Sequence, residues 1–370
     1  MVFIWLLLLC LVTVKRVYAH PQLPPPTGLY KTGVLNLQVT DPSRKDLFAP
    51  TEDRKLMFSI FYPTNESASP RELNPYITPV VASLFEQQHP IPNGSLTTII
   101  GNAKANADPL PLTSPKRLLF SHGGGTSRLI HTALLEDVAS HGYISISIDH
   151  PYDATAVEFI DGTIIYRDPS PFTATLLDNW YRQRLDDIYF IDRLTSDLSI
   201  LYGTPQAVSA AAVGGHSFGG AAVAGAMIES HNYTAGFNFD GAFWNNSILG
   251  NAENPFFIMG GPVRIPDGDT SWDTFRAAQT GWEREVIVNG TQHFGFTDFG
   301  ILVDVLGLER TAEIDAFVGT IDAERALEIQ RRYVMDYLDW VFDDGEGELV
   351  QGPSLEFPEV DFIPLSQARR

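Results

Sequence analysis

The hydrophobic pattern along this chain changes repeatedly between short apolar runs and the three-to-four-residue spacing of amphipathic helices. The apolar runs that predict strands are residues 33–39, 55–62, 117–120, 143–148, 210–213, 235–239, 255–259 and 285–288. Helical spacing predicts helices after residue 126, over 176–202, from Ala221 onward and over 323–342. Because parallel strands need helical crossovers, this alternation predicts an α/β fold with a mostly parallel central sheet flanked by helices.

The length of 370 residues suits one large domain with insertions. We expect a single domain over residues 20–370. Prolines and scattered apolar residues set segment 63–116 apart, which predicts an insertion packed over the sheet edge or the active site, as scaffolding or as a lid. Residues 343–370 are expected to form a C-terminal tail.

The first nineteen residues have the pattern of a secretory signal peptide. An apolar run over 1–14 is too short to cross a bilayer, and small residues precede an expected cut near Ala19. Lys15 and Arg16 follow the apolar run instead of preceding it, so a membrane anchor and a later dibasic cut are the alternatives. The pattern favours secretion.

Composition narrows the class of protein further. With 45 acidic and 25 basic residues the formal charge is −20, which repels phosphate backbones and argues against nucleic-acid binding. Cys10 is the one cysteine, so the mature chain would have no disulfide and no thiolate metal site. Five N-glycosylation sequons fit an exported glycoprotein, and their asparagines are Asn65, Asn93, Asn232, Asn245 and Asn289.

A glycine-flanked serine carries the candidate chemistry. Gly215-His-Ser217-Phe-Gly219 follows an apolar strand and opens a helix of small residues. The bare motif is a weak signal, but this context is typical of the sharp turn that exposes a nucleophilic serine on the α/β-hydrolase fold. We therefore expect Ser217 to be the nucleophile.

A serine nucleophile needs a base and an acid, which on this fold follow it in the order acid, then histidine. Only two histidines follow Ser217, and His231 ends the helix of the serine turn before any strand has delivered an acid. His293 is left as the base. For the acid, Asp240 directly ends an apolar strand, whereas Asp267 and Asp269 follow the next strand in a turn; burial favours Asp240 without excluding the other two.

Acyl transfer also needs N–H donors for the oxyanion. The backbone N–H of Phe218 is the first expected donor, and Gly124 in the run Ser121-His-Gly-Gly-Gly125 is the best candidate for the second. His122, Phe243 and Trp244 are candidates for the substrate pocket, although core packing is an equally good interpretation of the two aromatic residues. No ligand spacing predicts a metal site, and the chemistry requires no cofactor.

Five features of the chain recur together in one group of enzymes. They are Phe120-Ser-His-Gly, Ala139-Ser-His-Gly142, Gly215-His-Ser-Phe-Gly-Gly220, Asp240 at 23 residues past the serine, and His293-x-x-Phe296-x-Asp298-Phe299. Together they resemble the platelet-activating-factor acetylhydrolase family of phospholipase A2-like serine esterases. Residues 37–44 and 353–360 look more like secreted fungal members than like the animal plasma enzyme. The resemblance extends from about Tyr30 to Phe342. It implies Ser217, Asp240 and His293 as the triad and Gly124 and Phe218 as the oxyanion hole.

The resemblance implies a serine carboxylic ester hydrolase that cleaves short sn-2 acyl esters of phospholipids through an acyl-enzyme, as 1-alkyl-2-acetylglycerophosphocholine esterases do. Expected partners are a small ester or phospholipid and, transiently, a lipid surface. Segment 63–116 does not match the lipid-docking surface of the animal enzyme, so a secreted esterase acting on polyesters or other non-phospholipid esters is the alternative. An inactive binding module on the same fold would normally lack a triad member. The sequence leaves the acyl length and the oligomeric state open.

Overall fold

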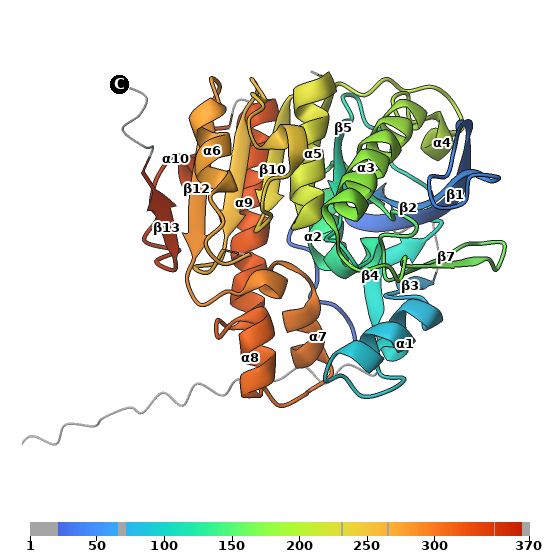
Figure 1. The fold of residues 1–370 in the computed structure, drawn as a ribbon, viewed down its shortest axis with the longest axis horizontal. Helices are drawn as coiled ribbons and strands as arrows, with labels where there is room; N and C mark the ends of the chain where they lie inside the picture. Colours follow the sequence, from blue (N-terminus) through green and yellow to red (C-terminus); the bar gives the residue numbers. More distant parts are fainter. Residues whose placement is uncertain (1–20, 66–71, 231, 265, 344, 365–370) are drawn as a thin grey trace, which may run out of the picture.

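The computed structural model describes residues 21–65, 72–230, 232–264, 266–343 and 345–364. Within them an eleven-stranded sheet runs in the order β13-β12-β11-β10-β9-β5-β6-β2-β1-β4-β3 (Figure 1). The strands of this sheet are β1 Lys31–Lys45, β2 Asp53–Thr64, β3 Leu73–Pro75, β4 Ile100–Ala105, β5 Lys116–Ser121, β6 Ile144–Ile148, β9 Ala210–His216, β10 Ala235–Phe239, β11 Phe256–Gly260, β12 Glu283–Val288 and β13 Val360–Ile363. A separate hairpin pairs β7 Ala156–Glu158 with β8 Ile164–Tyr166.

Helices connect these strands. They are α1 Pro79–Gln88, α2 Thr132–Ser140, α3 Ala174–Leu194, α4 Ser199–Tyr202, α5 Phe218–Ser230, α6 Ser271–Ala278, α7 Phe299–Val305, α8 Ala312–Val318, α9 Ala323–Asp343 and α10 Glu348–Gln351. Strands β6, β5, β9, β10, β11 and β12 pair in parallel, while β2 and β13 pair antiparallel to the two ends of this run. The prediction of an α/β-hydrolase fold with a mostly parallel sheet is confirmed.

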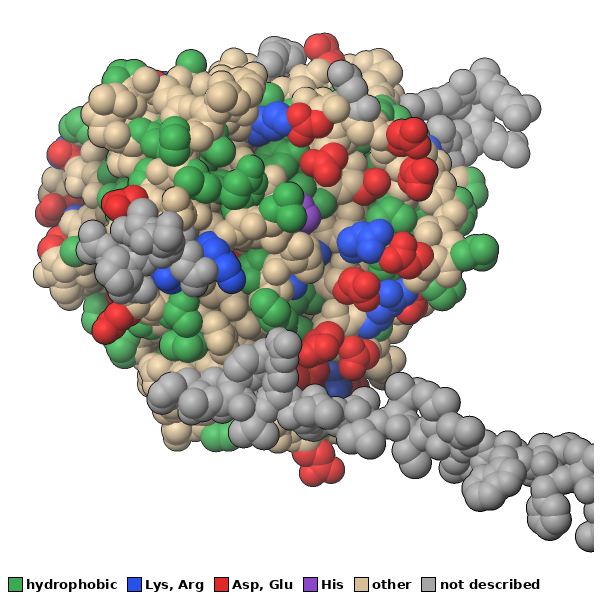
Figure 2. All heavy atoms as spheres, turned by 180° about the vertical axis from the view of Figure 1, so that it is seen from behind, with side chains coloured by type: hydrophobic (Ala, Val, Ile, Leu, Met, Phe, Trp, Pro, Cys, Tyr) green, Lys and Arg blue, Asp and Glu red, His purple; other side chains and the backbone are tan. Residues whose placement is uncertain are grey.

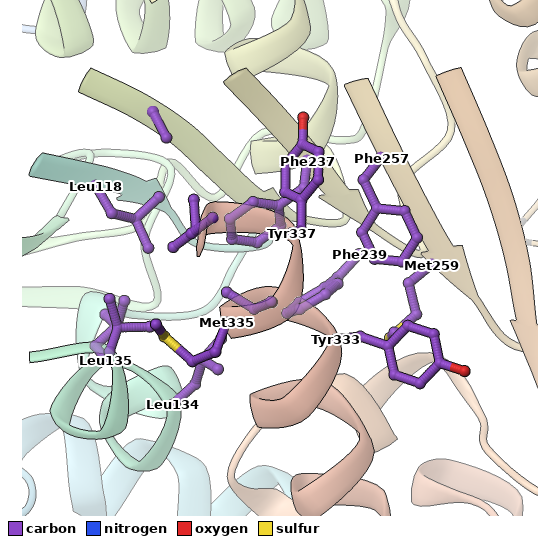
Figure 3. Close-up of a cluster of buried hydrophobic side chains, with 14 of the residues drawn as sticks. Leu118, Leu134, Leu135, Phe237, Phe239, Phe257, Met259, Tyr333, Met335 and Tyr337 are labelled. Atoms are coloured by element: carbon purple, nitrogen blue, oxygen red, sulfur yellow. The ribbon is translucent and has the colours of Figure 1, made fainter. Parts of the chain in front are cut away.

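The two faces of the sheet are covered by different helices. Figure 3 shows one side of the core, where Leu134 and Leu135 of α2 and Tyr333 and Tyr337 of α9 pack beside phenylalanines of β10 and β11. On the other face α3, α5 and α6 contribute side chains such as Tyr181, Ala222 and Trp272. The central parallel strands are buried on both faces, which explains their continuous apolar runs in the sequence.

A third apolar cluster lies at one end of the sheet. It joins α1 to α7 and α8 through residues that include Phe85, Phe299 and Val318. Figure 1 shows these three helices grouped at the same end of the molecule. Since α7 and α8 follow β12, this cluster covers the carboxyl ends of the parallel strands, where ligands bind on open α/β sheets.

The segment that stood out in the sequence, residues 63–116, holds β3, α1 and β4. Strand β4 pairs with β1 and β3 and so extends the sheet edge, while α1 belongs to the end cluster. The packing agrees with an insertion over the sheet edge, and a lid motion stays a prediction. The predicted leader, residues 1–19, lies outside the described residues.

The helix predicted over 176–202 ends earlier than its periodicity indicates. It forms α3 and stops at Leu194, and α4 follows after a break. The Thr195 hydroxyl donates to the carbonyl of Ile191 at 2.7 Å, and Leu198 is fully buried with a φ of 51°. Local side-chain bonding and a left-handed residue interrupt the helix while the apolar pattern continues.

The predicted C-terminal tail is packed onto the domain as far as it is described. Val350, Phe357 and Val360 are buried in the same core as α9, and β13 extends the sheet beside β12. The sequence prediction also did not anticipate the β7–β8 hairpin, whose exposed tip has no core-facing alternation to reveal it.

Candidate active site

Ser217 lies on the sharp turn between β9 and α5. Its φ is 55°, a left-handed conformation that is rare for a residue with a side chain. The two flanking glycines permit it: a Cβ on Gly215 would lie 2.4 Å from the Gly219 carbonyl carbon, and one on Gly219 would lie 2.0 Å from the Ser121 carbonyl oxygen. The Ser217 N–H donates to the carbonyl of Phe239 at 2.8 Å, which fixes the turn against β10. The turn holds the serine side chain above the sheet end.

Three side chains from three different strand ends meet at this turn. His293 Nε2 lies 2.9 Å from Ser217 Oγ, and His293 Nδ1 lies 2.6 Å from Asp240 Oδ2. The Asp240 carboxylate is 1% exposed and the His293 side chain 12%, so the acid is enclosed while the imidazole borders solvent. This is the distance pattern of a nucleophile, a base and an orienting acid.

Of the three acids that the sequence leaves open, Asp240 is the one beside His293. Its other oxygen, Oδ1, accepts the N–H of Gly261 at 2.8 Å, and its own φ is 51°. The Asp269 carboxylate instead accepts the N–H and hydroxyl of Ser271 at the start of α6, and Asp267 is exposed. Nothing in the sequence predicts the hydrogen bond from Gly261 to Asp240, because Gly261 follows the next strand.

His216, inside the serine motif, holds the backbone of His293. Its Nε2 lies 3.0 Å from the His293 carbonyl oxygen, and the two rings are 4.7 Å apart. Burial lowers the pKa of His216 well below its usual value, and the neighbouring His293 adds to this effect. His216 is therefore neutral and donates through Nε2. His216 occupies a position of the serine motif where any residue is allowed, so the sequence did not predict its role.

The run Ser121–Gly125 forms a turn next to the start of α5. A Cβ on Gly124 would lie 3.6 Å from Phe218 Cβ, and one on Gly123 would lie 3.2 Å from Ser217 Cβ. The N–H of Gly125 is engaged by the Asp153 carbonyl at 3.1 Å, whereas Gly124 is exposed. The N–H of Phe218, as the first residue of its helix, has no acceptor within the helix. Gly124 and Phe218 are thus the neighbouring pair at which an oxyanion could be held.

A buried network of hydrogen bonds and an ion pair holds the Ser121–Gly125 turn in place. Arg184 donates through Nη1 to the carbonyl of His122 at 2.5 Å and to Ser121 Oγ at 2.9 Å, and its Nε pairs with Asp153. The Arg184 guanidinium also lies over the Phe218 ring, with Cζ 5.3 Å from the ring centroid. One fully buried arginine therefore contacts both the turn that carries Gly124 and the side chain of Phe218.

The same network contains a second serine, histidine and aspartate in hydrogen-bonding order. Ser121 Oγ lies 2.9 Å from His150 Nε2, and His150 Nδ1 lies 2.9 Å from Asp187 Oδ2. Burial opposes ionisation of Asp187, but the guanidinium of Arg54 outweighs it and lowers the pKa of this carboxyl. All three side chains are at most 1% exposed, so this set cannot reach a substrate and serves the structure.

The three predicted pocket residues lie in different surroundings. His122 is fully buried beneath the glycine turn, with Nδ1 2.7 Å from the Gly123 carbonyl oxygen. Phe243 is buried and stacks on Phe275 with ring centroids 3.9 Å apart, as a core residue does. Trp244 is half-buried, and its Nε1 donates to Asp178 at 2.9 Å. Their role in substrate binding stays a prediction.

Aromatic rings of the end cluster border the base. Phe294 meets the His293 ring edge-on at 5.3 Å and stacks on Phe317 of α8 at 4.1 Å. The ring centroid of His89, which follows α1, lies 4.7 Å from that of Phe317 and 6.4 Å from that of Phe294. The inserted segment therefore reaches the wall of the candidate site.

Asp298 at the start of α7 is a buried acid of the end cluster. Its carboxylate lies 3.3 Å from the N–H of Ala133, at the start of α2. Burial raises its pKa from 3.8 to about 7, partly offset by this hydrogen bond. A raised pKa means that the folded state takes up a proton more readily than the unfolded chain. Asp298 therefore stabilises the fold most below pH 4, and this stability is lost as the pH rises through 7.

We expect the substitution Asp298→Asn to remove this pH dependence. The shift of about three pKa units corresponds to roughly 4 kcal/mol of unfolding free energy. From pH 4 to pH 8 the natural protein should lose about that much stability through Asp298, and the variant should not. Urea denaturation at both pH values measures the difference. Glu313→Gln, at an exposed position of α8, is the control and should change nothing. Equal pH slopes for Asp298→Asn and the natural protein would contradict the assignment.

Metal and membrane features can be stated for the described residues alone. No group of three or more His, Cys, Asp or Glu side chains there could hold a metal ion. No helix in the same ranges is long and apolar enough to cross a membrane.

The fold and the hydrogen-bonded site define a serine hydrolase of the α/β-hydrolase class that acts on carboxylic esters. The profile of the family described as "Platelet-activating factor acetylhydrolase, isoform II" matches residues 16–163 and 197–353. The chain belongs to this family, and the resemblance stated from its motifs is confirmed.

Individual relatives agree with the family. A probable 1-alkyl-2-acetylglycerophosphocholine esterase from Arthroderma benhamiae is 32% identical over 377 residues, covering 92% of this chain and 93% of that protein. A platelet-activating factor acetylhydrolase from Cavia porcellus is 23% identical, covering 87% of this chain and 78% of that protein. Among solved structures, a ferulic acid esterase from Streptomyces cinnamoneus superposes with a TM-score of 0.80 at 30% identity, covering 94% of this chain and all of the other.

Proposed function

We propose that this protein hydrolyses short sn-2 acyl esters of glycerophospholipids, with Ser217, His293 and Asp240 as its catalytic triad. The observation that carries the proposal is the continuous hydrogen-bonded line from Ser217 Oγ through the imidazole to the Asp240 carboxylate. The similarity to the fungal relative along nearly the whole of both chains supports the substrate class.

In the proposed mechanism His293 Nε2 takes the proton of Ser217 as its oxygen attacks the ester carbonyl. The N–H groups of Phe218 and Gly124 stabilise the oxyanion of the tetrahedral intermediate. His293 then gives its proton to the leaving alcohol, and a water molecule repeats the sequence on the acyl-enzyme. Asp240 keeps the proton of the neutral imidazole on Nδ1.

A second candidate is hydrolysis of feruloyl or related non-phospholipid esters. It is favoured by the solved structure of a ferulic acid esterase, which is nearly as similar in sequence as the fungal relative. Both activities use the same triad chemistry, so the surroundings of the site decide between them.

The proposal includes secretion and transient contact with a lipid surface. All five sequon asparagines are exposed, which fits glycosylation in an exported protein. The region around the β7–β8 hairpin exposes Ile160, Tyr166 and Phe172, at 66%, 53% and 63% of their surface, and such side chains suit brief contact with lipid.

A hydrolysis panel separates the two candidates. We expect kcat/KM for a 2-acetyl glycerophosphocholine to exceed that for methyl ferulate by at least about tenfold, a difference within reach of a few specific contacts. Initial rates on these two substrates and on a polyester film, with a soluble aryl acetate as reference, measure it. If methyl ferulate is the faster substrate, the phospholipid assignment is wrong and the esterase class remains.

A further inference from the structure

Arg167, at the exit of the β7–β8 hairpin, lies against the candidate oxyanion turn. A Cβ on Gly125 would be 3.3 Å from Arg167 Nη1, while one on Gly123 would be 3.2 Å from Ser217 Cβ. The two glycines are two residues apart, so their Cα atoms are separated by at most about 7 Å, and by less on a turn. The Arg167 cation and the serine therefore lie against the same short turn.

The position of Arg167 is defined by neighbouring structure. Its N–H donates to the Thr155 carbonyl at 3.2 Å, and the Thr155 N–H donates to Thr126 at the end of the glycine turn at 2.8 Å. The guanidinium lies over the ring of Phe172, at 5.3 Å, and that ring meets the buried Trp180 edge-on at 5.5 Å. Stacking of this kind restricts the side chain without neutralising its charge.

Arg167 differs from the other arginines of this region in having an exposed charge. Arg128 and Arg184 are buried and pair with Asp149 and Asp153. Arg167 is exposed, and within the described residues no carboxylate lies within ion-pair distance of it. On the face drawn in Figure 2 acidic side chains stand at many separate places among hydrophobic and polar ones. An exposed cation without a carboxylate partner, on a turn next to the candidate site, is free to bind an anion from outside.

We propose that Arg167 is the subsite for the phosphodiester of the substrate. This inference rests on the proposed function and deepens it. A guanidinium donates two parallel hydrogen bonds to a phosphodiester and remains charged at all working pH values. In a glycerophospholipid the sn-2 carbonyl and the phosphate are joined by a short glycerol linkage, and Gly125, which borders Arg167, directly follows Gly124 on the turn. With the carbonyl at Gly124, the phosphate reaches the guanidinium, whereas a neutral feruloyl ester has no group for it.

The test compares two substrates that differ only in the phosphodiester. They are 1-alkyl-2-acetylglycerophosphocholine and the matching 1-alkyl-2-acetylglycerol. We expect Arg167→Gln to lower the ratio of their kcat/KM values by about 10-fold to 100-fold, mainly through KM. Arg167→Lys should recover part of this loss, and the control Arg332→Gln, at an exposed position of α9 far along the chain, should leave the ratio unchanged. A ratio unchanged in Arg167→Gln, or an equal loss on both substrates, would overturn the proposal.

A binding measurement keeps this inference separable from the proposed hydrolysis. In a Ser217→Ala background, calorimetry with a short-chain glycerophosphocholine below its micelle concentration should show binding about tenfold weaker when Arg167 is also replaced by Gln. The matching 1-alkyl-2-acetylglycerol, which lacks the phosphodiester, should lose no affinity in the same double variant. Equal losses for the two ligands, or binding of the phospholipid that is independent of Arg167, would overturn the subsite. A natural protein that binds the phospholipid through Arg167 without hydrolysing it would overturn only the proposed reaction.

Discussion

Replacing Ser217 by alanine should lower turnover of a soluble aryl acetate by about 10⁴-fold to 10⁶-fold, because the only nucleophile at the hydrogen-bonded centre is removed. Labelling by a fluorophosphonate should disappear in the same variant. The fold should persist, since alanine is smaller than serine and the turn is held by the backbone bond to Phe239 and by the flanking glycines. Thermal unfolding of the natural and variant proteins checks the fold.

The chain supplies a matched control for this experiment in Ser121. Its hydroxyl has the same relation to His150 and Asp187 that Ser217 has to its own partners, but it is fully buried. Labelling should therefore persist in Ser121→Ala. A label that survives Ser217→Ala and is lost in Ser121→Ala would mean that the buried serine is the reactive one.

The second large effect is expected from Asp240→Asn, which should reduce kcat by about 10⁴-fold. Asparagine can keep the bond from Gly261 through its oxygen but presents an N–H to His293 Nδ1, which favours the wrong tautomer of the base. The change preserves the size of the side chain, so its effect reports on proton position.

Asp269→Asn is the matched control, because Asp269 lies in the loop after the next strand and its carboxylate is bound to Ser271. It should alter kcat by less than about threefold, as expected for a group remote from the reacting atoms. Steady-state rates on an aryl acetate compare the two variants. If Asp269→Asn caused the larger loss, the orienting acid would have to be moved to that loop.

Much of the site could be read from the sequence because each of its parts has a local signature. The serine turn is marked by glycines that close backbone contacts demand, and the base by elimination among two histidines. The supporting groups lack such signatures. Arg184 and Arg167 reach the glycine turn from α3 and from the hairpin, and His216 holds the His293 backbone from a position that tolerates any residue in the motif. Their roles depend on contacts between residues far apart in the chain.

The amino-acid sequence by itself determined the order of the central strands and the main helices, the family, and the residue types of the triad, because hydrophobic period and turn chemistry act over a few neighbouring positions. The tertiary structure placed Asp240 beside His293, buried Ser121 beneath the glycine turn and put the Arg167 guanidinium against that turn. These outcomes depend on burial and on distances of a few ångströms between separate strand ends. The packing of the whole sheet sets those distances, and no local segment of the chain encodes them.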